Sequence, residues 1–365
     1  MSNKNANKNA KLVFYGEHTA SLSLYLDGLP PDLAAVVRIV RPHSLLTDLP
    51  VLAAAGLVIH VRSFDTALHG DIDAALIRLG VPRAWFTDDD LLALALDQPG
   101  FASYSSARLR AFTASLVAVI GTTRGLCKRL AAFHPRVLHW PCVADSSLLP
   151  PVEMPQPDRL RVAVFGGAFR AQGLRRSVLP ALAALPGAEL VVTDALASSA
   201  PGAMILPFEP DFRRFIQAWR HARPAIVVHP PGIAANLPAK GPGSVLAALY
   251  LGAVPVVAEE PAFAGLHAAH GVLRAAQDPE SWHAALASLA SPQARQRCLA
   301  ALATHCTATY TAGPAADAIA VLQGHAAPAG EAAARRRAAW LLAARQRISH
   351  HLGMRMGRRG GVRSL

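Results

Sequence analysis

The sequence predicts an α/β protein built from two doubly wound parallel sheets in series. Short runs rich in β-branched residues alternate with longer stretches of helical periodicity, which is typical of a parallel sheet covered by helices on both faces. A proline-rich stretch interrupts this alternation near residue 150, and the same pattern then begins again. A chain of 365 residues is also long for one hydrophobic core. We therefore expect two Rossmann-like domains that face one another across a cleft.

The first half contains candidate strands that are short and mostly apolar. They are Lys11–Tyr15, Ala35–Val40, Gly56–Arg62, Ala84–Asp88, Leu116–Gly121 and Val137–Pro141. Helices of ordinary length fit between most of them, and the one expected over residues 123–133 begins at Thr123, which can cap a helix. These elements define an N-terminal domain over residues 1–148.

The second half repeats the alternation after a linker. Four prolines fall within residues 149–158, where they remove backbone donors and block helix formation. The candidate strands that follow are Arg161–Phe165, Glu189–Thr193, Met204–Pro207, Ala225–His229 and Val254–Ala258. Helices are expected over residues 174–185, 211–220, 244–251 and 282–289. The second domain is expected to cover residues 159–325.

The net charge of +12 is concentrated at the two ends of the chain. Three lysines and no acidic residue fall in the first eleven residues, and from Glu331 onward nine arginines accompany one acidic residue. Residues 12–330 are therefore nearly neutral. We expect a basic C-terminal tail over residues 326–365, with an amphipathic helix over 331–351 and a glycine-rich end that frays.

The basic tail indicates an acidic partner. Each arginine near an anionic lipid surface contributes about 1 kcal/mol of attraction, and nucleic acid attracts the same charges. We favour a membrane over nucleic acid because the rest of the chain shows no basic stripe or aromatic platform, and a solvated tail without a partner is the alternative. The sequence shows neither a signal peptide nor an apolar run of about 18 residues, so we expect a cytoplasmic protein, peripheral on the inner face of the membrane if the tail binds lipid.

The cysteines indicate neither a disulfide framework nor a metal site. Cys127, Cys142, Cys298 and Cys306 form no CxxC pair, which fits reduced thiols in the cytosol. His305 precedes Cys306, but adjacent residues on a helix point in different directions. We therefore expect no metal and no bound cofactor.

Residues 236–258, with the sequence NLPAKGPGSVLAALYLGAVPVVA, are similar to the C-domain signature of GT-B glycosyltransferases of bacterial surface-polysaccharide pathways. In that signature an asparagine, a lysine four residues later and a helix precede Gly-x-Pro-Val-Val-Ala. LVIHVR at 57–62, AWFTDDDL at 84–91 and LHWPCVAD at 138–145 agree in order, so the resemblance covers most of residues 12–310. It implies the GT-B fold, with a nucleotide sugar bound in the cleft and the acceptor on the side of the first domain.

Glycosyl transfer requires stabilisation of the charge that develops on the departing nucleoside diphosphate. Without a metal, cations and a helix N-terminus provide it. Gly166 and Gly167 follow a strand and can let backbone N–H groups approach a phosphate, while Arg170 and Lys240 are the expected cation pair. An ordinary βα turn and a solvated loop lysine are the structural alternatives. The other expected donor-binding residues are His229, Asn236, Gly243 and Ser244.

An acidic run follows the candidate strand that ends at Asp88. Asp89 and Asp90 are candidates for a catalytic base or an acceptor-binding group, whereas the competing interpretation, which we favour slightly, makes the run an N-terminal helix cap. His60 and Arg62 share one face of another strand and could reach the cleft, although a buried core histidine explains His60 as well.

The sequence departs from the family where relatives carry glutamates that contact the donor. The matching positions are Ala239 and Ala247. Two functions therefore remain open: a hexosyltransferase-type enzyme that moves a sugar from a nucleotide sugar to a glycan or lipid-linked acceptor in surface polysaccharide or glycoconjugate synthesis, and a catalytically silent nucleotide- or glycan-binding or scaffold protein. A dehydrogenase is disfavoured because no GxGxxG opens either half.

Overall fold

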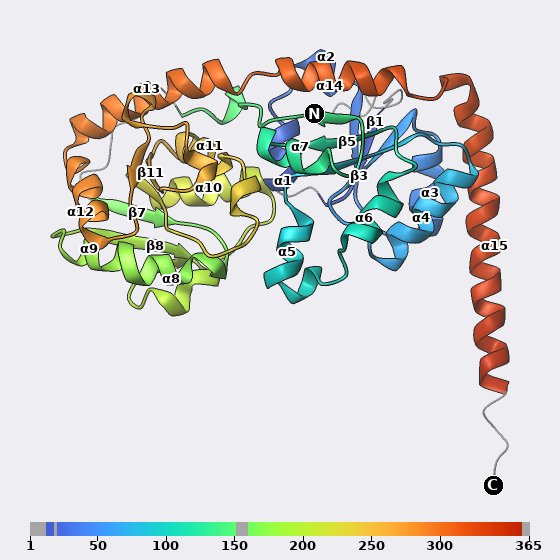
Figure 1. Ribbon diagram of the computed structural model, residues 1–365, viewed down its shortest axis with the longest axis horizontal. Helices are drawn as coiled ribbons and strands as arrows, with labels where there is room; N and C mark the ends of the chain where they lie inside the picture. Colours follow the sequence, from blue (N-terminus) through green and yellow to red (C-terminus); the bar gives the residue numbers. More distant parts are fainter. Residues whose placement is uncertain (1–11, 18–19, 151–159, 360–365) are drawn as a thin grey trace, which may run out of the picture.

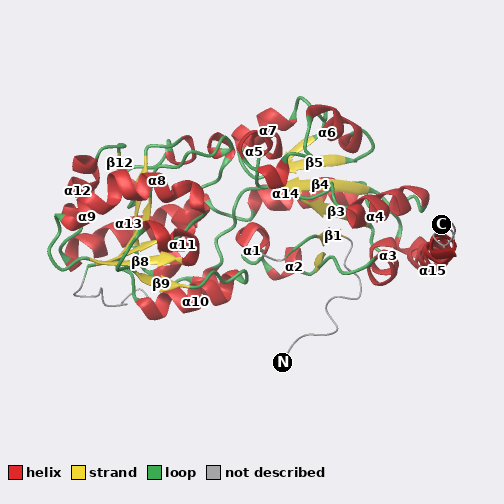
Figure 2. Cartoon of the chain, turned by 90° about the horizontal axis from the view of Figure 1, so that it is seen from below, coloured by secondary structure: helices red, strands yellow, loops and turns green. Residues whose placement is uncertain are grey.

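The computed structural model describes residues 12–17, 20–150 and 160–359. Over these residues the chain forms two lobes, each with a six-stranded parallel sheet. The lobes lie side by side in Figure 1, and helices flank both sheets in the view of Figure 2. The predicted fold class, two doubly wound α/β domains followed by a helical tail, is confirmed. Residues 151–158 of the expected linker lie outside the described residues.

The strands of the first lobe are short and largely buried. They are β1 (Leu12–Tyr15), β2 (Val37–Val40), β3 (Leu57–Val61), β4 (Arg83–Thr87), β5 (Ala118–Gly121) and β6 (Val137–His139). Their order in the sheet is β2-β1-β3-β4-β5-β6, so the winding direction reverses between β1 and β3. Open α/β sheets bind ligands beyond the carboxyl ends of the strands at such a reversal.

The helices of the first lobe connect these strands. They are α1 (Ala20–Leu26), α2 (Pro31–Ala34), α3 (Leu45–Ala53), α4 (Ala67–Arg78), α5 (Leu91–Asp97), α6 (Ser106–Thr113) and α7 (Arg124–Leu130). Thr123 caps α7 as expected, because its Oγ1 accepts the Leu126 amide at 3.1 Å.

The second lobe repeats the arrangement. Its strands are β7 (Arg161–Val164), β8 (Glu189–Thr193), β9 (Met204–Leu206), β10 (Ile226–His229), β11 (Val254–Ala258) and β12 (Leu273–Ala275). The order β12-β11-β10-β7-β8-β9 places the reversal between β7 and β10. The sequence did not predict β12, a three-residue edge strand that is too short to show a period.

Helices of the second lobe precede a C-terminal segment that returns to the first lobe. The helices of the second lobe are α8 (Ala171–Gly173), α9 (Leu179–Ala183), α10 (Phe212–Ala222), α11 (Gly243–Leu251), α12 (Pro279–Ser288) and α13 (Pro292–Thr309). The C-terminal segment consists of α14 (Gly313–Gly324) and α15 (Ala332–Arg359). A π-helical turn, Leu174–Val178, joins α8 to α9. The sequence assigns α14 to the second domain, yet α14 contacts β6 and α15 packs against α3 (Figure 1).

One apolar core runs from one lobe into the other. It combines side chains of α1 with those of α10 and α11, including Leu22, Trp219 and Leu249. Helix α11 is buried at every position from Val245 to Leu251, and it ends at Gly252 in the left-handed conformation, with φ of 67°. This packing holds the N-terminus of α11 at the boundary between the lobes.

Candidate active site

A cavity of about 710 Å³ lies between the lobes, and we call it the interlobe cavity. The first lobe contributes Ala20 and Leu24 near α1 and Arg62 at the end of β3, and the second lobe contributes the remaining lining residues. The expected donor-binding residues that line it are Gly166, Gly167, His229, Lys240, Gly243 and Ser244. They come from the carboxyl ends of β7 and β10 and from the start of α11.

The N-terminus of α11 opens into the interlobe cavity. Gly243 and Ser244 form its first turn, and no side chain caps it. The free amides of a helix start and the helix dipole both favour an anion there. The chain packs closely at Gly243, because an added Cβ would lie 2.7 Å from Cδ1 of Leu24 and would require the Leu24 side chain to move.

Lys240 provides a cation beside this helix start. Its ammonium group forms an ion pair with Asp89 of the first lobe, and 33% of its side chain stays exposed. Burial lowers the pKa of Lys240 to about 8, and Asp88 partly opposes that effect. Because this value lies above neutrality, the side chain remains mostly charged at pH 7.

Asp89 joins the lobes at the edge of the interlobe cavity. Its side chain is 3% exposed and is paired with both Arg62 and Lys240. Asn236, an expected donor-binding residue, is buried and donates its amide nitrogen to Oδ1 of Asp89 at 2.7 Å. Asp88 completes the cluster through Nε of Arg62 at 2.6 Å. Asp89 is therefore held by donors from both lobes.

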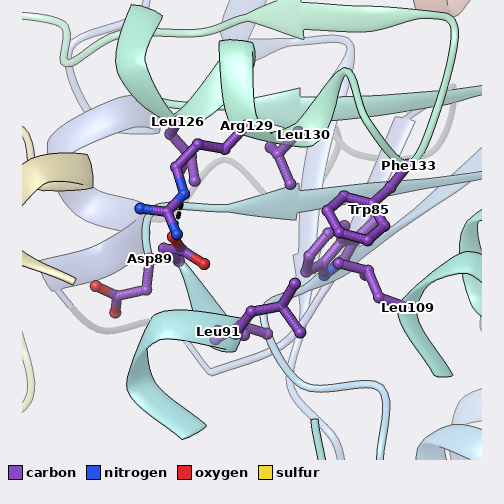
Figure 3. A pocket seen from close by; sticks show the side chains of 10 residues that line it. Trp85, Asp89, Leu91, Leu109, Leu126, Arg129, Leu130 and Phe133 are labelled. Carbon is purple, nitrogen blue, oxygen red and sulfur yellow. Dashed lines mark ion pairs between the residues drawn. The ribbon is translucent and has the colours of Figure 1, made fainter. Parts of the chain in front are cut away.

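Asp90 serves as a helix cap. Its Oδ1 accepts the Ala93 amide at 3.1 Å, and its Oδ2 lies 2.6 Å from Nε of Arg129. The cap interpretation is thus confirmed for this residue. Asp89 and Asp90 also border a smaller cavity of about 220 Å³, whose far end is lined by Trp85 and other apolar side chains (Figure 3).

Arg170 does not line the interlobe cavity, contrary to the expectation that it forms a cation pair with Lys240. It is 2% exposed, and its NH1 and NH2 atoms contact the carboxylate of Glu260 at 2.5 and 2.9 Å. NH1 also donates to the carbonyl of Pro230, and the Gly232 amide donates to Oε1 of Glu260 at 2.8 Å. Glu260 follows β11, and the sheet brings it beside the turn that follows β7. A short sequence motif does not reveal this pairing, because the two residues are far apart in the chain.

His229 lines the interlobe cavity as a neutral imidazole. Burial, followed by the charges of Arg170 and Lys240, holds the pKa of His229 well below its usual range. The ring packs edge-on against Phe263, with the centroids 5.0 Å apart. The imidazole can therefore exchange hydrogen bonds with a ligand without adding charge.

Of His60 and Arg62, which could share one face of a strand, only Arg62 lines the interlobe cavity. His60 is fully buried, with Nε2 lying 3.1 Å from Oδ1 of Asp73, so the core interpretation holds. Arg62 adopts a left-handed backbone with φ of 53°, which breaks the strand alternation and lets its side chain line the interlobe cavity. Backbone strain at a residue that lines a cavity is common in functional sites.

One wall of the interlobe cavity is aromatic and acidic, and no motif in the sequence indicates it. Its phenylalanines are Phe165, Phe208, Phe212 and Phe215. Its carboxylates belong to Asp194, directly after β8, and to Glu209, after β9. Both carboxylates follow the carboxyl end of a parallel strand, and this position could have identified them in the sequence as candidates for the ligand site.

Neither a metal cluster nor a membrane span is found in the described ranges. No group of three or more His, Cys, Asp or Glu side chains in them is placed to hold a metal ion. None of their helices combines the length and apolar character that crossing a bilayer requires.

No protein-family model and no curated protein matches the sequence. Solved structures do match. Sucrose-phosphate synthase from Thermosynechococcus elongatus is similar with a TM-score of 0.57 and 14% identity, covering 86% of this chain and 97% of that chain. The protein has the GT-B glycosyltransferase fold. HepE of Anabaena in complex with UDP and glucose has a TM-score of 0.56 and 12% identity over 86% of this chain and 99% of that one. Its complex with UDP-glucose has a TM-score of 0.55 at 12% identity, covering 85% and 99% of the two chains.

Proposed function

We propose that this GT-B protein is a glycosyltransferase that holds a nucleotide sugar in the interlobe cavity. The observation that carries the proposal is the placement of Lys240 beside the uncapped start of α11, on a cavity that both lobes line. These two positive features fit a diphosphate, which carries its charge at one end of the donor. HepE, which has the same fold, binds UDP and UDP-glucose, and this supports a nucleotide-sugar donor.

In the proposed reaction an acceptor hydroxyl displaces the nucleoside diphosphate from the anomeric carbon of the sugar, and the hydroxyl proton passes to the departing diphosphate, whose freed oxygen accepts it. As the bond from that carbon to the phosphate oxygen breaks, Lys240 and the first amides of α11 stabilise the negative charge on the departing group. The hydroxyl of Ser244 and the backbone of Gly166 and Gly167 add contacts to the phosphates. Asp89 acts as a positioning residue that holds the Lys240 ammonium at the cavity edge. We expect this charge stabilisation to operate without a metal.

We further propose that the acceptor is a glycan or a lipid-linked glycan at a membrane surface. Helix α15 begins on the first lobe and continues past it (Figure 1). Trp340 and Leu341 are 59% and 62% exposed there, beside the exposed Arg336 and Arg337. Exposed aromatic and aliphatic side chains flanked by arginines suit the interface of an anionic bilayer. Such an enzyme would act at the inner face of the membrane in glycoconjugate synthesis.

A catalytically silent binding protein is the second candidate. Ala247 lines the interlobe cavity and Ala239 is 1% exposed, so neither offers the donor the carboxylate that the family resemblance places there. A protein of this kind would bind the nucleotide without transferring the sugar.

Calorimetric titration with uridine, guanosine and thymidine diphosphate sugars tests the proposal. We expect one donor to bind and Lys240→Ala to weaken its binding at least tenfold, because a charge-assisted contact contributes roughly 1.5–3 kcal/mol. Lys128→Ala removes the same charge from the exposed surface of α7 and serves as the matched control. Binding without donor turnover would favour the silent protein, and the absence of any binding to the folded chain would refute both.

A further inference from the structure

The two ends of the interlobe cavity differ in charge. Lys240 and Arg62 line it beside the start of α11, which follows β10, whereas Asp194 and Glu209 follow β8 and β9 on the other side of β7 in the sheet. A nucleoside diphosphate has the same asymmetry, with anionic phosphates at one end and an uncharged sugar and base at the other. Because carboxylates repel phosphates, the acidic end favours the nucleoside.

Helix α11 lines part of the cavity, so its rise per residue gives a distance along the cavity. Gly243 and Ala247 both line the cavity and lie one turn apart, a rise of about 6 Å. If the diphosphate sits at the first turn, the pentose attached to it falls beside Ala247. The alanine methyl group cannot bond to the pentose hydroxyls, so any polar contact must come from another element.

Glu209 can supply that contact. It lies three residues before the first residue of α10, which packs beside α11, with the rings of Phe212 and Tyr250 centred 6.2 Å apart. The Asp211 amide donates to Oε1 of Glu209 at 2.9 Å, which orients the carboxylate. Its second oxygen can accept a hydroxyl proton from a ligand.

An exposed aromatic ring lies next to this carboxylate. Phe208 is 65% exposed and lines the interlobe cavity. A large aromatic side chain that stays exposed inside a cavity is suited to stacking with a nucleobase, because every base has a flat face that can stack on an aromatic ring. Phe208 and Glu209 together therefore match a base and the sugar bonded to it.

We propose that Glu209 binds the 2′- and 3′-hydroxyls of the donor nucleoside, so that the donor is a ribonucleoside rather than a 2′-deoxyribonucleoside diphosphate sugar. A carboxylate that accepts from the vicinal diol loses one of these two bonds when the 2′-hydroxyl is missing. This proposal rests on the proposed function, and it assigns to Glu209 the role that neither Ala239 nor Ala247 can fill.

The test compares UDP with 2′-deoxy-UDP, and GDP with 2′-deoxy-GDP, by calorimetry on the full chain. We expect the wild type to bind the ribose form of one pair about ten- to a hundredfold more tightly, since hydrogen bonds to charged groups have that effect. Glu209→Ala should bring the ratio within about twofold by weakening the ribose form. Asp194→Ala, which removes another cavity carboxylate, is the matched control and should leave the ratio unchanged.

Three outcomes would overturn the proposal: equal binding of the two forms by the wild type, an unchanged ratio in Glu209→Ala, or an equal loss of the ratio in Asp194→Ala. If Glu209→Ala melts early, the isosteric Glu209→Gln replaces it and should also reduce the ratio, because it removes the charge. Binding of both forms that still depends on Lys240 would refute the Glu209 role alone. Failure of all nucleotides to bind the folded protein would refute the proposed function as well.

Discussion

Replacing Glu260 with alanine should destabilise the second lobe by about 3–5 kcal/mol, because it leaves a buried guanidinium without its counter-ion. Arg170 is 2% exposed, so bulk water solvates its guanidinium poorly when the carboxylate is removed. Both of its terminal nitrogens contact Glu260, at 2.5 and 2.9 Å. The amide of Gly232, 2.8 Å from Oε1, loses its acceptor in the same substitution.

Thermal unfolding followed by calorimetry measures this loss. A domain of about 200 residues shifts by roughly 2–4 °C per kcal/mol, so we expect the transition of the second lobe to fall by about 6–20 °C. The pair of Arg161 and Glu189 is the matched control, since its side chains are 22% and 34% exposed. Glu189→Ala should cost no more than about 1 kcal/mol. A change of that size in Glu260→Ala would refute the buried-pair interpretation.

A double variant separates a structural Arg170 from a phosphate-binding one. Arg170→Leu combined with Glu260→Leu removes both charges, and it should recover most of the lost stability because no unpaired ion remains. Donor affinity should then equal that of the wild type, as Lys240 and α11 are unchanged. Weak donor binding in a double variant of native stability would show that Arg170 reaches the phosphates.

Further predictions follow from the cavity, the tail and the end of α11. Because burial lowers the pKa of Lys240 to about 8, nucleotide affinity should be full near neutral pH and fall as the ammonium deprotonates above that value; a flat calorimetric profile to about pH 10 contradicts this. Replacing Arg336 and Arg337 with glutamate should lower the affinity for anionic phospholipid vesicles, measured by cosedimentation, at least tenfold, since each charge contributes about 1 kcal/mol. Unchanged sedimentation would exclude this face. Gly252→Ala should cost about 1–2 kcal/mol in thermal unfolding, because φ is 67° there, whereas Gly265→Ala, with open space around it, should cost little.

The sequence predicted most of the strands because they are buried parallel strands, which appear as short apolar runs between helices. The Val254–Ala258 strand, which has the bounds expected from the sequence, is an example. It missed Leu273–Ala275, where three residues pair with one neighbouring strand only. It also placed Lys240 and the start of α11 near a strand end, because the winding of such sheets brings strand ends together.

The order of residues along the chain shows which chemical groups follow the strands, whereas the packing of distant elements establishes which of these groups meet. Arg170 and Lys240 are similar in sequence terms, since each is a lone cation between a strand and a helix. In the fold Arg170 is paired with Glu260, 90 residues away, while Lys240 meets Asp89 of the other lobe at the cavity edge. Sequence patterns report a helix turn or a strand period, but the partner of a charge depends on packing between distant elements. That packing left Lys240 on the lining of the interlobe cavity and buried Arg170 against Glu260.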